Sequence, residues 1–142
     1  MADNHSVSQR QYNMSQIHSQ NTKPEEIVRR YLFSRGLRYR KNDKRYPGTP
    51  DIVLPRYKSI VFVNGCFWHH HNCSKFHWPL SNINYWRKKI DRNVQRDILN
   101  TCKLEEQGWQ VLVIWECELK KTVREKNLKL LYENITHKGN EA

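Results

Sequence analysis

The sequence predicts one α/β domain, in which helices flank a mixed sheet and a structural zinc site holds one loop. Helical periodicity alternates with short apolar runs that are typical of strands. Cysteines and histidines are concentrated in residues 64–73. A chain of 142 residues fits one domain with its own core. The predicted helices cover residues 22–35, 83–107 and 122–134, and the strands cover residues 52–54, 60–63 and 109–115.

Residues 1–22 are expected to form a mobile arm ahead of a single domain at residues 23–142. The arm is rich in Ser, Gln and Asn, and such a segment buries too little apolar surface to offset the entropy lost on ordering. Two interpretations stay open, an arm that orders against a partner and a plain frayed terminus.

The first helix is predicted to begin at Asn21 or Thr22 as N-cap and to end at Gly36. A proline and two acidic residues in its first turn suit the backbone geometry and the helix dipole there. Glu25 lies three residues before the apolar Val28, so its carboxylate is expected at the edge of the buried face. The alternative is an acidic residue that serves only the helix dipole.

Cationic side chains are dense in and after this helix. A track for DNA phosphates explains that density better than a solvated surface, because each neutralised phosphate releases counterions. The cations of this predicted track are Arg29, Arg30, Arg35, Arg38, Arg40, Lys41, Lys44 and Arg45.

Residues 52–54 and 60–63 read as a β-hairpin. If the hairpin is symmetric about Tyr57, Asp51 pairs opposite Val63, and its carboxylate lies beside the Val63 carbonyl. Such a pair of oxygen ligands, completed by water, suits Mg²⁺. The alternative makes Asp51 a turn residue that follows Pro50.

The Cys/His loop is predicted to bind zinc through Cys66, His71 and Cys73, with Cys117 as the fourth ligand. Three cysteines and one histidine form a closed structural zinc site when they reach tetrahedral geometry. Disulfides, buried thiols and a polar histidine turn are the alternatives. Cysteine and histidine spacings in cytosolic chains favour the metal.

Residues 83–107 read as a long helix capped by Ser81 or Asn82, with Trp86 near the zinc loop. Apolar residues at every fourth position are predicted to pack in the core: Ile90, Val94, Ile98 and Cys102.

Gly108 is expected to end this helix, and residues 109–115 form an apolar strand predicted to be buried on both faces. The final helix, residues 122–134, is assigned to packing through Val123, Leu128, Leu131 and Ile135.

The composition predicts a polyanionic partner. Lys and Arg number 25 against 14 Asp and Glu, which gives a net charge of +11. The longest apolar runs are far shorter than the ~20 residues of a membrane span. The first residues do not resemble a secretory signal. We therefore expect a cytoplasmic monomer that binds nucleic acid and no membrane.

The motifs together resemble the very-short-patch repair (Vsr-type) mismatch endonucleases, within the PD-(D/E)xK nuclease superfamily. The Pro50-Asp51 pair on a hairpin is only weakly specific, whereas the Gly65-Cys-Phe-Trp-His-His-His71 run is highly specific. The resemblance covers almost the whole chain. Its other motifs are Pro47-Gly-x-Pro-Asp51, Cys73, Lys89-Ile90, Asn93-Val94, Arg96-Asp97, Gly108-Trp109 and Trp115-Glu-Cys117.

The resemblance implies a zinc-stapled, restriction-endonuclease-like fold that starts very short patch repair of DNA damage. The family nicks double-stranded DNA next to the T of a T:G mismatch, which arises when 5-methylcytosine deaminates. It implies that Asp51 and the Val63 carbonyl hold catalytic Mg²⁺, and that Glu25 and His69 act through water. Structural zinc would be held by Cys66, His71, Cys73 and Cys117, while Phe67, Trp68 and Trp86 would intercalate beside the mismatch. The N-terminal arm would clamp the opposite groove.

Val63 and Asn64 depart from the family, which typically has threonine followed by histidine there. A carbonyl ligand does not depend on its side chain, so valine is expected to preserve metal binding. Asn64 is expected to modulate the rate or the mismatch selectivity.

Other functions remain to be separated by experiment. The main alternative is a zinc-stabilised DNA-binding module without catalysis. A restriction enzyme for paired DNA and an HNH-type nuclease that uses the histidine run are two more. The flanking bases, mismatches other than T:G, a partner methyltransferase and downstream repair proteins are not indicated by the sequence.

Overall fold

The computed structural model describes residues 22–71, 73 and 77–140, and the predicted arm therefore lies outside the described residues apart from Thr22. A four-stranded sheet in the order β1-β2-β3-β4 forms its centre. The first three strands pair antiparallel, and β3 and β4 pair parallel, so the predicted mixed α/β sheet is confirmed. The strands are β1 (Arg40–Lys41), β2 (Ile52–Leu54), β3 (Ser59–Asn64) and β4 (Gln110–Trp115).

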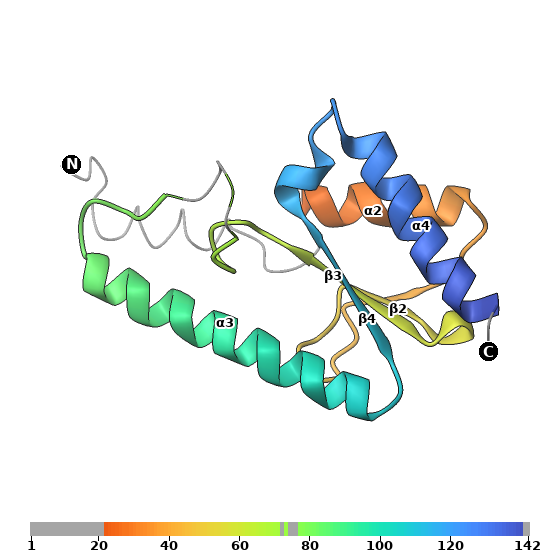
Figure 1. The fold of residues 1–142 in the computed structure, drawn as a ribbon, viewed down its shortest axis with the longest axis horizontal. Helices are drawn as coiled ribbons and strands as arrows, with labels where there is room; N and C mark the ends of the chain where they lie inside the picture. Colours follow the sequence, from red (N-terminus) through yellow and green to blue (C-terminus); the bar gives the residue numbers. More distant parts are fainter. Residues whose placement is uncertain (1–21, 72, 74–76, 141–142) are drawn as a thin grey trace.

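Helices cover both faces of the sheet (Figure 1). Side chains of α2 (Lys23–Ser34) and α4 (Arg124–Asn140) pack against one face, in a core that includes Val28, Val61 and Leu131. The long helix α3 (Ile83–Glu106) covers part of the other face, where its Leu104 joins a smaller cluster. Short 3₁₀ helices, η1 (Pro55–Tyr57) and η2 (Glu116–Leu119), follow β2 and β4. None of the described helices is both long and apolar enough to cross a bilayer.

The first helix begins as predicted, with Thr22 as the N-cap. The Glu25 amide donates to Thr22 Oγ1 at 3.4 Å, and the Thr22 amide donates to Glu25 Oε2 at 3.3 Å. This capping box satisfies backbone donors that the first turn leaves without intrahelical partners. It also fixes the side chain of Glu25, which is only 3% exposed. Gly36 follows the helix with a φ of +87°, as expected of a residue that ends it.

The predicted hairpin register is wrong by one residue. Ile52 pairs with Val61 and Leu54 with Ser59, so continuing the ladder places Asp51 opposite Phe62 rather than Val63. The connection is not symmetric about Tyr57, because η1 is followed by Lys58 in the left-handed region. The Asp51 carboxylate nevertheless reaches residue 63, through the hydrogen bond described below.

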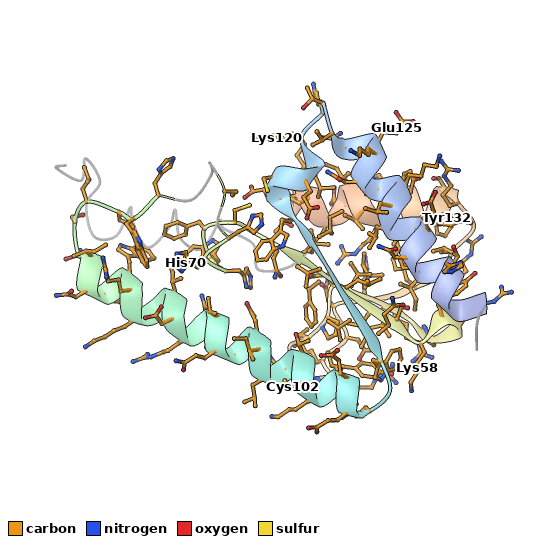
Figure 2. The ribbon with its side chains drawn as sticks, viewed as in Figure 1. Lys58, His70, Cys102, Lys120, Glu125 and Tyr132 are labelled. Carbon is orange, nitrogen blue, oxygen red and sulfur yellow. The ribbon has the colours of Figure 1, made fainter. Side chains whose placement is uncertain are left out.

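The apolar stripe predicted for α3 is also wrong. Ile90 is fully buried, but Ile98 is 60% exposed and Cys102 is exposed (Figure 2). Each four-residue step turns the helix by about 40° beyond one full turn, so Cys102 faces roughly 120° away from Ile90. The second fully buried residue of the helix is Leu104 instead. Asn82 occupies the N-cap position without a capping side-chain hydrogen bond.

The strand β4 is not buried on both faces, contrary to the prediction. It lies at an edge of the sheet, and Val113 is 41% exposed while Ile114 is buried. The helix α4 begins at Arg124, later than predicted, and leaves Val123 39% exposed. Its other predicted core residues, Leu128, Leu131 and Ile135, are buried.

Candidate active site and metal cluster

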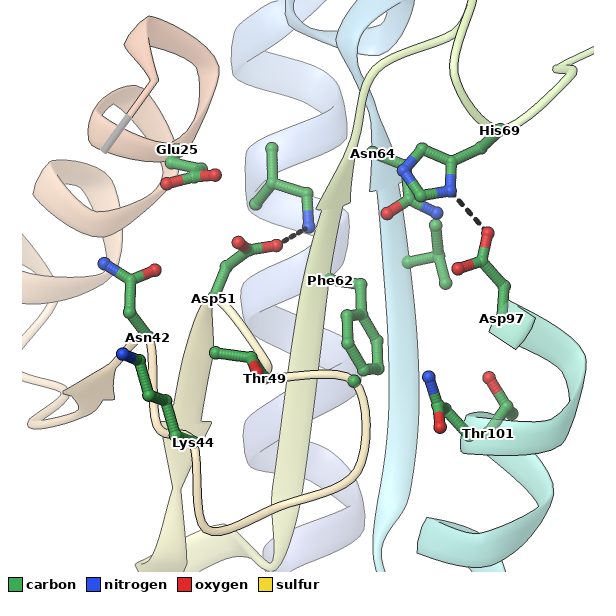
Figure 3. Close-up of a pocket in the computed structure, with 14 residues that line it drawn as sticks. Glu25, Asn42, Lys44, Thr49, Asp51, Phe62, Asn64, His69, Asp97 and Thr101 are labelled. Carbon is green, nitrogen blue, oxygen red and sulfur yellow. Dashed lines mark hydrogen bonds and ion pairs between the residues drawn. The ribbon is translucent and has the colours of Figure 1, made fainter. Parts of the chain in front are cut away.

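One pocket, with a volume of about 380 Å³, brings together the five residues that were predicted to act in or modulate catalysis (Figure 3). Glu25 comes from the first turn of α2 and Asp51 from the residue before β2. Val63 and Asn64 end β3, and His69 belongs to the loop that follows. Residues distant in the sequence therefore meet at one end of the β2–β3 hairpin.

Asp51 is held by the backbone of the neighbouring strand. The Val63 amide donates to Asp51 Oδ2 at 2.7 Å, which fixes the carboxylate inside the pocket. Burial is the main effect that raises the pKa of Asp51, and the Glu25 carboxylate adds to it while the Val63 amide opposes it, so that the net pKa is about 7. A carboxylate so poorly solvated gains free energy from a bound cation. Asp51 and its neighbours therefore fit a divalent metal.

The buried side chain of Arg29 forms hydrogen bonds with both acidic residues. Its Nη2 donates to Glu25 Oε2 at 3.2 Å, to Asn42 Oδ1 at 3.1 Å and to the Asp51 backbone oxygen at 3.2 Å. Arg29 is only 5% exposed, so it is no part of the predicted phosphate track. Sequence reasoning missed this role, although the spacing of four residues from Glu25 is typical of a helical ion pair.

Replacing Arg29 with methionine should lower the free energy of unfolding by about 3–5 kcal/mol, because Glu25 would stay buried without its cation. Urea denaturation checks this value. The control is Arg30→Met, whose partner Glu26 lies 4.0 Å away on the exposed side of α2 and whose loss should cost under about 1 kcal/mol. Glu25→Gln combined with Arg29→Met should recover part of the loss. Equal effects of the two arginine variants would contradict the buried pair.

His69 contacts a residue to which the sequence gave no role. Its Nδ1 lies against Asp97 Oδ2, and both side chains line the pocket (Figure 3). Nδ1 donates to the Asp97 carboxylate when that nitrogen carries the ring proton, and in this tautomer Nε2 is the acceptor. Asp97 lies seven residues from both Ile90 and Leu104, on the face of α3 turned toward the sheet. That spacing is the signal that could have found it.

The four predicted zinc ligands lie together, and they could hold one metal ion. One ligand atom each from Cys66, His71, Cys73 and Cys117 falls within 4.8 Å of all the others. Cys117 Sγ lies 3.4 Å from His71 Nδ1, and the His71 ring stacks on Trp115 with centroids 4.0 Å apart. Burial raises the pKa of the Cys66 thiol to about 12, so a cation is needed to keep it as the thiolate that binds metal.

Three aromatic rings form a separate group, called here the aromatic cluster: Phe67, Trp68 and Trp86. The Phe67 ring centroid lies 5.1 Å from that of Trp68 and 5.5 Å from that of Trp86. All three side chains are partly exposed and none belongs to a buried core cluster. Phe67 and Trp68 follow directly after the candidate metal ligand Cys66 and precede His69, whereas Trp86 belongs to α3. One loop therefore carries two of the rings, candidate metal ligands and the pocket histidine.

Comparison with known proteins gives a consistent result. A family model described as DNA mismatch endonuclease Vsr matches residues 2–75. The chain is 52% identical to the type II nicking enzyme V.NmeAIP of Neisseria meningitidis, over 95% of this chain and 97% of that protein. It is 46% identical to the type II nicking enzyme V.XorIIP of Xanthomonas oryzae, over 84% of this chain and 88% of that protein. It is 41% identical to DNA mismatch endonuclease Vsr of Escherichia coli, over 84% of this chain and 77% of that protein.

Proposed function

This chain belongs to the Vsr family of DNA mismatch endonucleases, and we propose that it nicks one strand of duplex DNA next to the T of a T:G mismatch. The nick would start very short patch repair after deamination of 5-methylcytosine. The observation that carries this proposal is the meeting of Asp51, Glu25 and His69 in one pocket, on a basic protein of net charge +11. The proposal includes the nicking of mismatches other than T:G.

The catalytic cofactor is proposed to be Mg²⁺, held by Asp51 and the Val63 carbonyl. Bound there, Mg²⁺ supplies the positive charge that offsets the negative charge developing on the leaving oxygen. His69 uses Nε2 to accept the proton of the attacking water, because Asp97 holds the other ring nitrogen. Glu25, fixed by Thr22 and Arg29, orients that water. Asn64 lines the same pocket and modulates the rate or the selectivity.

The metal of the Cys/His cluster is proposed to be zinc, in a structural role. Three thiolates and one imidazole are the donor set of closed zinc sites. Their positions support this role, because Phe67, Trp68 and His69 lie between Cys66 and His71 in the sequence, and the ligand atoms of all four residues lie close together. Cys117 ties that loop to η2, at the end of β4.

The aromatic cluster is proposed to enter the base stack beside the mismatch. Separating a base step costs a few kcal/mol, and the cost is least at a mismatched pair. Stacking on an aromatic side chain returns about 1–3 kcal/mol per base. Three rings can therefore offset the cost at a mismatch more readily than in paired DNA. Residues 1–22 would clamp the opposite groove, and the enzyme would act as a cytoplasmic monomer on the bacterial nucleoid, ahead of downstream repair proteins.

Replacing Phe67 with alanine should reduce the preference for mismatched over paired DNA by about 5–100-fold, the equivalent of one lost stacking contact. Competition binding with T:G and T:A duplexes of otherwise equal sequence measures this ratio. The control is Phe33→Ala, since Phe33 is 53% exposed on α2 and lies outside the cluster. An unchanged ratio for the Phe67 variant would remove the cluster from mismatch recognition.

The direct test of the proposed function is a nicking assay over all mismatches in several sequence contexts. Duplexes labelled on either strand are incubated with Mg²⁺ or with chelator. We expect one nick beside the T of T:G, only with the divalent ion. Binding without nicking under every condition would favour the DNA-binding module, and double-strand breaks in paired DNA would favour a restriction enzyme.

A further inference from the structure

The pocket contains one cation that the proposed chemistry has not used. Lys44 is the only lysine or arginine among the fourteen described residues that line it. Three of the others, Glu25, Asp51 and Asp97, carry carboxylates. In Figure 3 the Lys44 side chain lies beside Asn42, on the same wall as Asp51. Its position separates it from the other cations of the predicted phosphate track, none of which lines the pocket.

The turn that carries Lys44 is tied to the segment that carries Asp51. The Asn42 amide donates to the Asp51 backbone oxygen, and the Asp43 amide donates to the Pro50 oxygen, both at 3.3 Å. Arg29 adds its hydrogen bonds to the Asn42 side chain and to the Asp51 oxygen. The base of the turn is thus fixed relative to Asp51, while the ammonium keeps the reach of a flexible stem.

The charged neighbours of Lys44 in the sequence, Asp43 and Arg45, form an ion pair with each other. Arg45 Nε and Nη2 donate to the two carboxylate oxygens of Asp43 at 2.9 and 2.7 Å. The Arg45 hydrogen bond is the main reason that the pKa of Asp43 falls to about 2. Lys44 stands between these two residues and makes no ion pair with any residue that the structure describes. Its charge is available to an anion that enters the pocket.

A phosphodiester that approaches Asp51 meets mostly negative charge. Arg29 lies behind Glu25, almost fully buried, whereas Lys44 is exposed at the pocket. We propose that Lys44 binds a non-bridging oxygen of the phosphodiester that is cut and stabilises its charge during hydrolysis. Lys44 is then a catalytic residue and not a member of a general phosphate track. This inference rests on the proposed nicking activity.

The first test separates the rate of cutting from DNA affinity. Single-turnover nicking of a T:G duplex at saturating protein should slow by about 10–100-fold in Lys44→Ala, since a charge aimed at the transition state is lost. Lys44→Arg should restore part of the rate. The matched control is Lys129→Ala, because Lys129 is exposed on α4, lies outside the predicted phosphate track and does not line the pocket. That variant should keep both the single-turnover rate and the DNA affinity of the parent.

The second test measures contact with one phosphate. Duplexes carry a neutral methylphosphonate either at the cut linkage or one linkage away, and binding is measured with zinc retained and Mg²⁺ omitted. If Lys44 binds the cut phosphate, Lys44→Ala should lose about 3–10-fold less affinity on the duplex modified there than on unmodified DNA. The neighbouring modification should leave the full loss. Equal rates for the two alanine variants, or equal losses on all duplexes, would overturn the role of Lys44, whereas a parent protein that nicks nothing would overturn the proposed function.

Discussion

Asp51→Asn is expected to abolish nicking while mismatch binding is retained. The substitution keeps the size of the side chain and an oxygen that accepts from the Val63 amide, but removes the charge that holds the divalent ion. We expect the single-turnover rate to fall by more than about 10³-fold, the equivalent of roughly 4 kcal/mol in the barrier. Nicking and binding of the same T:G duplex, measured side by side, check both parts.

The matched control is Asp91→Asn, because Asp91 is an exposed acidic residue of α3 outside the pocket. It should nick like the parent. If the Asp51 variant also nicks like the parent, the pocket is not the hydrolytic centre. If neither the parent nor the Asp51 variant cuts any DNA, and both bind mismatches, the chain is a binding module.

Asp51→Asn should also make the protein more stable at alkaline pH when Mg²⁺ is absent. The pKa of Asp51 rises from an ordinary 3.8 to about 7 on folding, so ionisation of this group favours the unfolded chain. The resulting cost is absent below the unfolded pKa, grows as the pH rises and is complete above the folded pKa. The thermal midpoint of Asp51→Asn should therefore exceed that of the parent by more at pH 8 than at pH 4. Adding Mg²⁺ at pH 8 should stabilise the parent more than the variant.

The second large effect is expected from Cys66→Ser. Structural zinc is worth roughly 10–16 kcal/mol in zinc-finger peptides, and loss of a buried ligand should remove a substantial part of the stabilisation here. We expect loss of bound metal, a thermal midpoint lower by at least about 10 °C and more exposed apolar surface. Metal analysis, thermal unfolding and dye binding measure the three results.

Cys102→Ser is the control for this experiment. Cys102 is exposed on α3 and does not belong to the metal cluster, so its substitution should change neither metal content nor thermal midpoint. A thermal midpoint unchanged in the Cys66 variant would show that the cluster does not support the fold. Because His69 lies between two ligands of the cluster, the Cys66 variant should also nick poorly even where it remains folded.

The three long helices and the strands β2, β3 and β4 could be predicted because local patterns determine them, whereas β1 and the 3₁₀ helices η1 and η2 were not predicted. Capping by Thr22, the end of the helix near Gly36 and the strand residues around Val61 follow from rules that span a few residues. The errors arose where a small offset in strand register or in helix rotation carries along an element. The hairpin register shifted because η1 and the left-handed Lys58 replaced a symmetric turn. The stripe on α3 was misplaced because a four-residue repeat drifts around a helix, which exposes Cys102.

The candidate site likewise contains residues that local sequence patterns predicted and residues that these patterns missed. The four residues that could hold a metal ion were grouped from the sequence because three of them lie within eight residues, at Cys66, His71 and Cys73. Asp97 and Arg29 were missed because their partners are set by how α3 and α2 pack on the sheet. Asp97 touches His69 across 28 residues, and Arg29 reaches the Asp51 backbone across 22. Such pairs follow from tertiary structure, which no single stretch of sequence specifies.

The parallel pairing of β3 and β4 has a consequence for how such an enzyme can change. Their register places Asn64 beside Trp115, so the loops that follow the two strands begin at the same end of the sheet. The aromatic cluster and the metal ligands belong to these loops or to the start of α3, whereas Asp51 is anchored to the strands themselves. His69, however, belongs to the same loop as Phe67 and Trp68 and also lines the pocket. A mutation that alters this loop is therefore expected to change the proposed mismatch recognition and the proposed hydrolysis together.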